Sequence, residues 1–177
     1  MPRRSRPPKS TVTARSLEEP DTHQVSSILV RRQAPGSARL SKAEVRSLAA
    51  CMLDALGLGE SELSILLTND RLIREINRDH RGKDKPTDVL SFPQSEFSAP
   101  LRPRRGFRLD VLGDVVISID TAERAALSRR RSLREEVRFL LAHGILHLVG
   151  YDHATPAEKE VMTKRTKELV RKAPLAP

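Results

Sequence analysis

The sequence predicts one α/β or α+β domain arranged around a small mixed sheet. Three observations lead to this prediction. Four short segments with β-branched residues and partial alternation are separated by stretches with helical caps. The last three helical stretches follow one another with no strand between them, which favours a cluster of helices packed on the sheet. The length of 177 residues is sufficient for one domain with a substantial core.

The expected elements alternate along the chain before the helical cluster begins. Strands are expected at residues 25–32, 62–69, 87–92 and 112–119. Helices are expected at 41–56, at 70–79, after Asp120, after Ser132, and from Pro156 to about Arg171. The first helix and the last three begin with capping-box spacing, in which a short polar residue is followed three positions later by glutamate.

The ends of the chain differ in composition. Residues 1–22 are rich in Arg, Pro, Ser and Thr and lack apolar periodicity, so burial cannot offset the entropy of ordering them. We therefore predict a disordered basic tail at 1–22 and a single domain at 23–177. Arg3 and Arg4 resemble an export signal, but no apolar segment follows them, so secretion is not expected. The Arg- and Pro-rich segment 94–108 is expected to be a long mobile loop.

Charge and composition restrict the partners and the compartment. The net charge of +9 favours an anionic partner, with nucleic acid first and an acidic membrane second. Aromatic residues make up only 3% of the chain, too few for a stacking platform, so contact with nucleic acid is expected mainly at the backbone. No apolar run approaches the ~18 residues of a membrane span. Because Cys51 has no intramolecular partner, a reducing compartment is expected, which is the cytoplasm.

The stretch HGILHLVGYDH, residues 143–153, holds three of the five histidines. His143 and His147 are four residues apart, which places both on one face of a helix. Gly150 can adopt the left-handed conformation that ends a helix, so His153 can turn back toward the other two. Three imidazoles around Zn²⁺ leave a fourth position open, as in a catalytic site. A single helical histidine is more often a surface or core residue, but the number and spacing here favour a metal site.

Gly144 follows the first histidine of this motif. The spacing HxxxHxxGxxH is shared with metzincin proteases, which carry a glutamate at that position as general base. Glycine has no side chain to accept a proton, so a protease is a weaker interpretation. Gly144 could instead make room for a bulky substrate.

A second motif, RGKDKPTDVLSFP, occupies residues 81–93. A run of charges is in general a solvated loop. Here, however, Pro86 fixes the entry to a strand, and Asp88 can bond to the local backbone, so the cations would project from a rigid base. Arg81 held in this way can bind a phosphate bidentately and stabilise charge that develops on phosphorus.

Together with LGDVVIS, these two motifs resemble the YbeY family of bacterial endoribonucleases, also called rRNA maturation factors. The motifs occur in the family's order, and the resemblance covers roughly residues 25–155. It implies a zincin (metzincin-like) α+β fold in which a mixed four-stranded sheet packs with about five helices. It also implies one Zn²⁺ held by His143, His147 and His153, and a role of Arg81 in activity.

The resemblance further implies single-strand-specific RNA cleavage in ribosomal RNA 3′-end maturation and ribosome quality control. The ribosome, the GTPase Era and small-subunit ribosomal proteins are the implied partners. The alternative hypothesis is a ribosome-binding assembly factor whose zinc is structural and which needs no cleavage activity. Asp152 and Asp114 can either orient the histidines or cap the ends of their elements.

Overall fold

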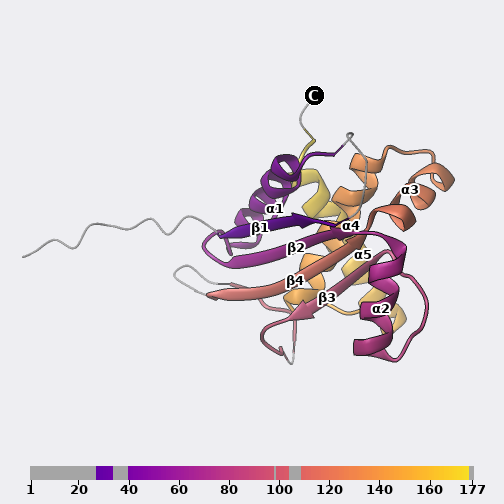
Figure 1. The fold of residues 1–177 in the computed structure, drawn as a ribbon. Helices are drawn as coiled ribbons and strands as arrows, with labels where there is room; N and C mark the ends of the chain where they lie inside the picture. Colours follow the sequence, from indigo (N-terminus) through magenta and orange to yellow (C-terminus); the bar gives the residue numbers. More distant parts are fainter. Residues whose placement is uncertain (1–26, 34–39, 98, 104–108, 176–177) are drawn as a thin grey trace, which may run out of the picture.

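The computed structural model describes residues 27–33, 40–97, 99–103 and 109–175 (Figure 1). It confirms an α+β fold with a four-stranded mixed sheet and five helices. In chain order the elements are β1 (Ile28–Arg32), α1 (Lys42–Leu56), β2 (Glu62–Thr68), α2 (Asp70–Arg81), β3 (Val89–Pro93), β4 (Val111–Ser118), α3 (Ile119–Ser128), α4 (Leu133–Leu148) and α5 (Pro156–Lys172). The predicted tail at 1–22 and residues 98 and 104–108 of the predicted loop lie outside the described residues.

The sheet has the strand order β1-β2-β4-β3. The first three of these strands are parallel, and β3 pairs antiparallel with β4 at the edge. One face carries the main core, where α1 and α4 contact the strands and α5 packs against both helices. The other face carries a smaller cluster beneath α2, and Figure 1 shows α2 beside β3. The edge strand β3 therefore lies between α2 and α4.

Alternation along β3 separates the two faces. Val89 packs into the main core, and Ser91 donates a hydrogen bond of 3.0 Å to the backbone oxygen of Gly144 in α4. Leu90 and Phe92 belong to the cluster under α2. Successive side chains of a strand point to opposite faces of the sheet, so β3 contacts a helix on each face.

Two helix boundaries differ from the sequence-based expectation. Asp120 is not the N-cap of α3; the helix starts at Ile119, and the Ser118 side chain accepts from the backbone N–H of Thr121. Asp120 instead accepts from the backbone N–H of Asp70 and so stabilises the start of α2. Helix α2 also runs two residues beyond the expected end at residue 79 and terminates at Gly82, where φ is +66°. Arg81 therefore lies on a helix and not in a loop.

Helix α4 is the buried centre of the molecule, as its apolar sequence predicts. Its residues Leu140, Leu141, Ile145, Leu146 and Leu148 expose 2% of their surface or less. The predicted capping box is present: Ser132 and Glu135 exchange hydrogen bonds with each other's backbone N–H groups. None of the helices in the described ranges is both long and apolar enough to cross a membrane.

Candidate metal centre

Three histidines converge at the end of α4, and each can offer one nitrogen such that all three lie within 4.8 Å of one another. His143 and His147 come from successive turns of the helix, with ring centroids 4.9 Å apart. Gly150 has a φ of +86° and turns the chain, and the His153 ring then lies 5.6 Å from that of His143 and 5.0 Å from that of His147. The predicted convergence is present, and the cluster can bind a metal ion.

The surroundings keep His143 and His147 in the neutral form. Burial lowers the pKa of His143 to about 4, with repulsion from His147 and His153 adding to the effect, and the Asp88 carboxylate opposes it. The pKa of His147 is lowered by burial and by repulsion from His153 and Arg81. A neutral imidazole has the lone pair that a metal requires, so His143 and His147 are ready to act as donors at neutral pH.

Groups around the histidines orient them in part. A hydrogen bond to the backbone of Tyr151 opposes the lowering of the His147 pKa, which places a fixed partner beside that ring. Asp152 accepts from the backbone N–H of His153 at 2.8 Å and thus shapes the turn. The suggestion that Asp114 orients the histidines is wrong. Asp114 is exposed and pairs with Phe92, on the sheet face that α2 covers.

Gly144 packs α4 against the sheet, so the suggestion that it makes room for substrate is also wrong. A Cβ at this position would come 2.8 Å from Cγ1 of Val115, 3.2 Å from Oγ of Ser91 and 3.3 Å from Cγ2 of Val89. The space beside Gly144 is therefore filled by strand side chains. The same contacts leave no room for the glutamate of a metzincin protease.

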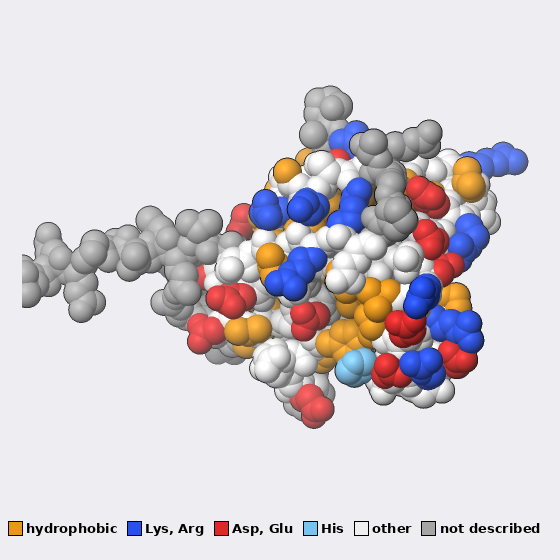
Figure 2. Space-filling model, viewed as in Figure 1, with side chains coloured by type: hydrophobic (Ala, Val, Ile, Leu, Met, Phe, Trp, Pro, Cys, Tyr) orange, Lys and Arg blue, Asp and Glu red, His pale blue; other side chains and the backbone are white. Residues whose placement is uncertain are grey.

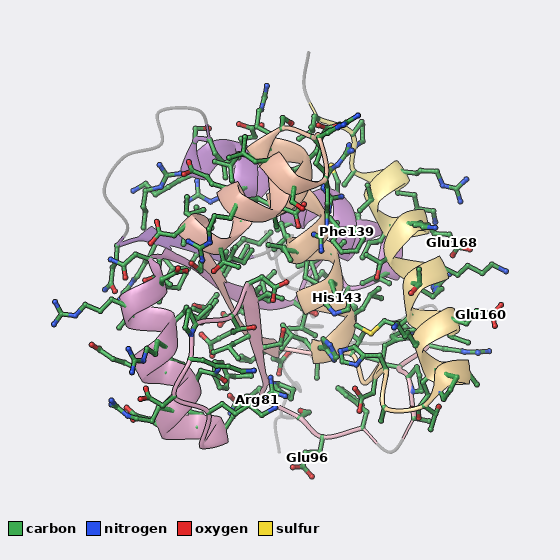
Figure 3. The ribbon with its side chains drawn as sticks, turned by 90° about the vertical axis from the view of Figure 1, so that its right-hand side faces the viewer. Arg81, Glu96, Phe139, His143, Glu160 and Glu168 are labelled. Carbon is green, nitrogen blue, oxygen red and sulfur yellow. The ribbon has the colours of Figure 1, made fainter. Side chains whose placement is uncertain are left out.

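A cleft of about 870 Å³ opens between α2, β3 and the end of α4. The three histidines border it together with Arg81, Lys83 and Asp88. Figure 3 shows Arg81 from α2 and His143 from α4 on the same side of the molecule. The structure thus brings the predicted Arg81 to the cleft that the histidines line. The positive charge of Arg81 contributes to the lowered pKa of His147.

The cations of α2 differ in whether acidic residues neutralise them. Arg74 makes two hydrogen bonds to Asp84, at 2.8 and 2.7 Å, and Arg78 pairs with Asp79 at 2.9 Å. Figure 2 shows side chains of both charges interspersed over this region. Arg81 and Lys83 make no ion pair with an acidic residue in the described part of the chain. Their charge is therefore available to an anionic ligand in the cleft.

The family model for Endoribonuclease YbeY matches residues 32–174. The chain belongs to the YbeY family. The Endoribonuclease YbeY of Anaeromyxobacter sp. (strain Fw109-5) is 50% identical over 135 residues, which are 75% of this chain and 65% of that protein. That of Aquifex aeolicus (strain VF5) is 48% identical over 131 residues, 74% of this chain and 80% of that protein. The match thus spans just under two thirds of the Anaeromyxobacter relative.

A solved structure shows the same fold. The solution structure of TM1509 from Thermotoga maritima superposes with a TM-score of 0.55 at 24% identity and covers 82% of this chain and 89% of that one. At this identity the likeness concerns the fold alone. The resemblance to the YbeY family that the sequence motifs indicate is confirmed by the family model and by the relatives.

Sequence reasoning missed several residues of this YbeY-family site. Phe139 lies one turn before His143, with the rings nearly parallel and their centroids 6.2 Å apart, and Arg131 lies 5.1 Å above the Phe139 ring. The spacing of four residues could have indicated this stack. His80 contacts Phe92 at 5.0 Å across two elements, which no local pattern reveals.

Proposed function

We propose that this chain is a metal-dependent endoribonuclease that cleaves single-stranded RNA. The observation that carries the proposal is the convergence of three imidazoles at the wall of a cleft that also holds the unneutralised Arg81. Membership of a family whose model is described as Endoribonuclease YbeY supports this reaction class. Ribosomal RNA 3′-end maturation and ribosome quality control are the proposed setting.

The donor set fits one zinc ion held by His143, His147 and His153. Imidazole nitrogen is a preferred zinc ligand, and three neutral imidazoles leave a fourth position for solvent or substrate. The group has three members in the described part of the chain, and it borders an open cleft, which favours a catalytic over a structural role. When bound, zinc would supply a Lewis acid and lower the pKa of a water molecule.

The chain's own residues bind and orient the RNA. Arg81 is the last residue of α2. Its planar guanidinium can bind two phosphate oxygens and stabilise the negative charge that develops on them. Lys83 adds a second cation at the same cleft. The backbone of Tyr151 fixes the His147 ring in one orientation.

The remaining proposals follow from the family. We propose a zincin-type arrangement of the metal helix, a single catalytic domain at 23–177 that follows a basic tail, and a cytoplasmic location. The ribosome is the proposed partner, with the GTPase Era and small-subunit ribosomal proteins as further candidates. The net charge of +9 is consistent with binding to RNA.

Cleavage of a labelled single-stranded RNA before and after chelation, and after zinc is restored, tests the proposal. Arg81→Ala should lower the single-turnover rate by about 100-fold, the size of effect seen when one donor to a developing anion is lost. Arg81→Lys should restore part of it, because it keeps the charge without the fork. Arg71→Ala is the matched control, since Arg71 lies on the same helix, is exposed and pairs with Glu75.

Full cleavage after both Arg81→Ala and His147→Ala would overturn the proposal. The alternative of an assembly factor with a structural zinc would gain if chelation lowered the melting temperature while the wild-type protein bound RNA and left it uncut. Casein digestion that a chelator inhibits would instead indicate a protease.

A further inference from the structure

A pair of rings stands at the cleft beside Arg81. The centroids of His80 and Phe92 are 5.0 Å apart, with the planes tilted by 60°. Both residues line the cleft that contains the three metal-site histidines. Arg81 lines the same cleft, so a ligand whose phosphate meets Arg81 can have these rings next to it.

The two rings are held by different parts of the fold. Phe92 is half-buried and packs at the margin of the small cluster that contains Ile73 and Leu90, so its buried side is anchored. His80 is exposed and lies in the last turn of α2. Aromatic rings that remain partly open at a cleft offer π-faces to a ligand at little further cost in ordering.

The turn after α2 is tied to the helix that carries His80. Asn77 is buried and donates to the backbone oxygen of Lys85 at 2.8 Å, and Arg74 holds both carboxylate oxygens of Asp84. These contacts tie residues 84 and 85 back onto the helix that carries His80. The backbone that carries His80 is therefore held in place before any ligand binds, and the ring itself contacts Phe92.

Rings gather on the other side of the cleft as well. Phe97 and Tyr151 line it, and a Cβ on Gly150 would lie 2.9 Å from the Cβ of Phe97, so the segment before residue 98 packs closely on the end of α4. Three of the chain's five Phe and Tyr residues thus line one cleft. The sequence-based expectation that aromatics are too few for stacking considered their number and not their position.

We propose that His80 and Phe92 form a nucleobase-stacking subsite, which holds the base of a nucleotide next to the phosphate at Arg81. This inference rests on the proposed function, because it takes RNA to be the ligand of the cleft. Each base in a duplex already has both faces covered by its neighbours, so only an unstacked nucleotide can use the subsite. The subsite therefore gives a physical reason for preferring single-stranded RNA.

Binding to metal-free protein tests the subsite separately from cleavage. The probe is a short single-stranded RNA with one 2-aminopurine, whose fluorescence falls when the base stacks, and a matched RNA that is abasic at that position. Both are titrated in chelator with wild type, His80→Ala, His80→Tyr and the control Arg71→Ala. The probe base is moved along the RNA to find the position that is quenched.

His80→Ala should weaken binding of the intact RNA by about tenfold, within the range for loss of one base–aromatic stack. It should abolish the quenching and leave binding of the abasic RNA unchanged. His80→Tyr should restore both the affinity and the quenching, and Arg71→Ala should match wild type. Unchanged melting temperature and zinc affinity of His80→Ala would show that the fold and the metal site are intact.

The subsite is refuted if His80→Ala binds the intact RNA as wild type does, if it weakens intact and abasic RNA equally, or if His80→Tyr behaves as His80→Ala. The outcome for the proposed function is separate. Wild-type protein that quenches the probe but leaves RNA uncut after zinc is restored would contradict the proposed nuclease activity and support the stacking subsite. Cleavage of RNA without quenching of the probe at any position would support the nuclease activity and contradict the stacking subsite.

Discussion

The two halves of α4 differ in whether their buried polar side chains have charged partners. In the first half, the Glu136 side chain is fully buried and is paired with Arg129, at 2.5 Å, and with Arg131. In the second half, His143 and His147 lose solvation and have no acidic hydrogen-bond partner among the residues that the structure describes. Together with His153 they bring nitrogens within 4.8 Å of one another. A buried charge that is paired, such as Glu136, stabilises the fold. Desolvated imidazole nitrogens that converge on one point instead form a site that can bind a ligand.

Phe139 connects the two halves. Its ring lies parallel to that of His143 and beneath the guanidinium of Arg131, which in turn pairs with Glu136. The contrast between the halves predicts that substitutions in the first half lower stability and that substitutions in the second half lower metal affinity.

The largest expected effect is that of His147→Ala on zinc affinity. Loss of a group that only supports a ligand costs 10–100-fold, so loss of a ligand should cost more than about 100-fold. The free energy of unfolding in chelator should change little, because the variant removes a desolvated ring. Competition titration with a zinc indicator measures the first quantity, and urea denaturation the second.

His80→Ala is the matched histidine variant for this measurement. His80 borders the same cleft but is not a member of the three-histidine group. It should bind zinc as wild type does. Equal zinc affinity of His147→Ala and wild type would remove the metal centre from the second half of α4.

Glu136→Ala should reverse that pattern. It leaves two arginines without their shared carboxylate, and breaking a buried pair costs about 3–5 kcal/mol. Because the Arg129 side chain is 52% exposed and can turn to water, we expect a smaller loss of about 2 kcal/mol in the free energy of unfolding. Urea denaturation in chelator measures this loss. The free energy of unfolding of Glu136→Gln should lie between those of Glu136→Ala and wild type.

Glu136→Ala should leave the intrinsic zinc affinity within a fewfold of wild type, measured where the protein is folded. A stable Glu136→Ala protein that binds zinc far more weakly would contradict the division of α4 and give Glu136 a role in the metal site.

The pH dependence of stability reports on the histidines in the second half of α4. Burial lowers the pKa of His143 from 6.5 to about 4 and also lowers that of His147, so the unfolded chain binds protons first as the pH falls. The histidine contribution to the free energy of unfolding of the metal-free protein should therefore decrease from about pH 6.5 toward pH 4, and at lower pH protonation of carboxylates such as Asp70, whose pKa is lowered, should decrease the stability further. His147→Ala should reduce the slope, and an unchanged slope would contradict the assignment. Chemical denaturation in chelator at several pH values measures it.

Local patterns predict much of this fold and of the candidate site. The caps at Ser132 and Thr155, the strand expected at 87–92 and the spacing of His143 from His147 depend on neighbours within one turn or strand. Their physics is contained in a short stretch of chain, so the sequence indicates them correctly.

The features that the sequence did not reveal depend on contacts between distant segments. Ser118 caps α3, whereas Asp120 accepts a hydrogen bond from the backbone N–H of Asp70 at the start of α2, which lies about 50 residues earlier in the chain. His80 meets Phe92 only after α2 folds over β3. Gly144 looks like an opening for substrate until Val115 is known to lie against it. Each error came from treating as local a residue whose partner is far away in the chain.

The smallest expected effect is that of Gly144→Ala. The added methyl would meet the Val115 side chain, whose β-branched χ1 is stiff, and overpacking of this kind costs about 1–3 kcal/mol. Alanine recovers about 1 kcal/mol of helix propensity, so the free energy of unfolding should fall by about 1 kcal/mol in urea denaturation. Gly144→Glu, which installs the metzincin carboxylate, should fail to fold because strands fill the space. A folded Gly144→Glu protein that digests casein would show that the close packing of α4 on the sheet is not what separates this site from a protease.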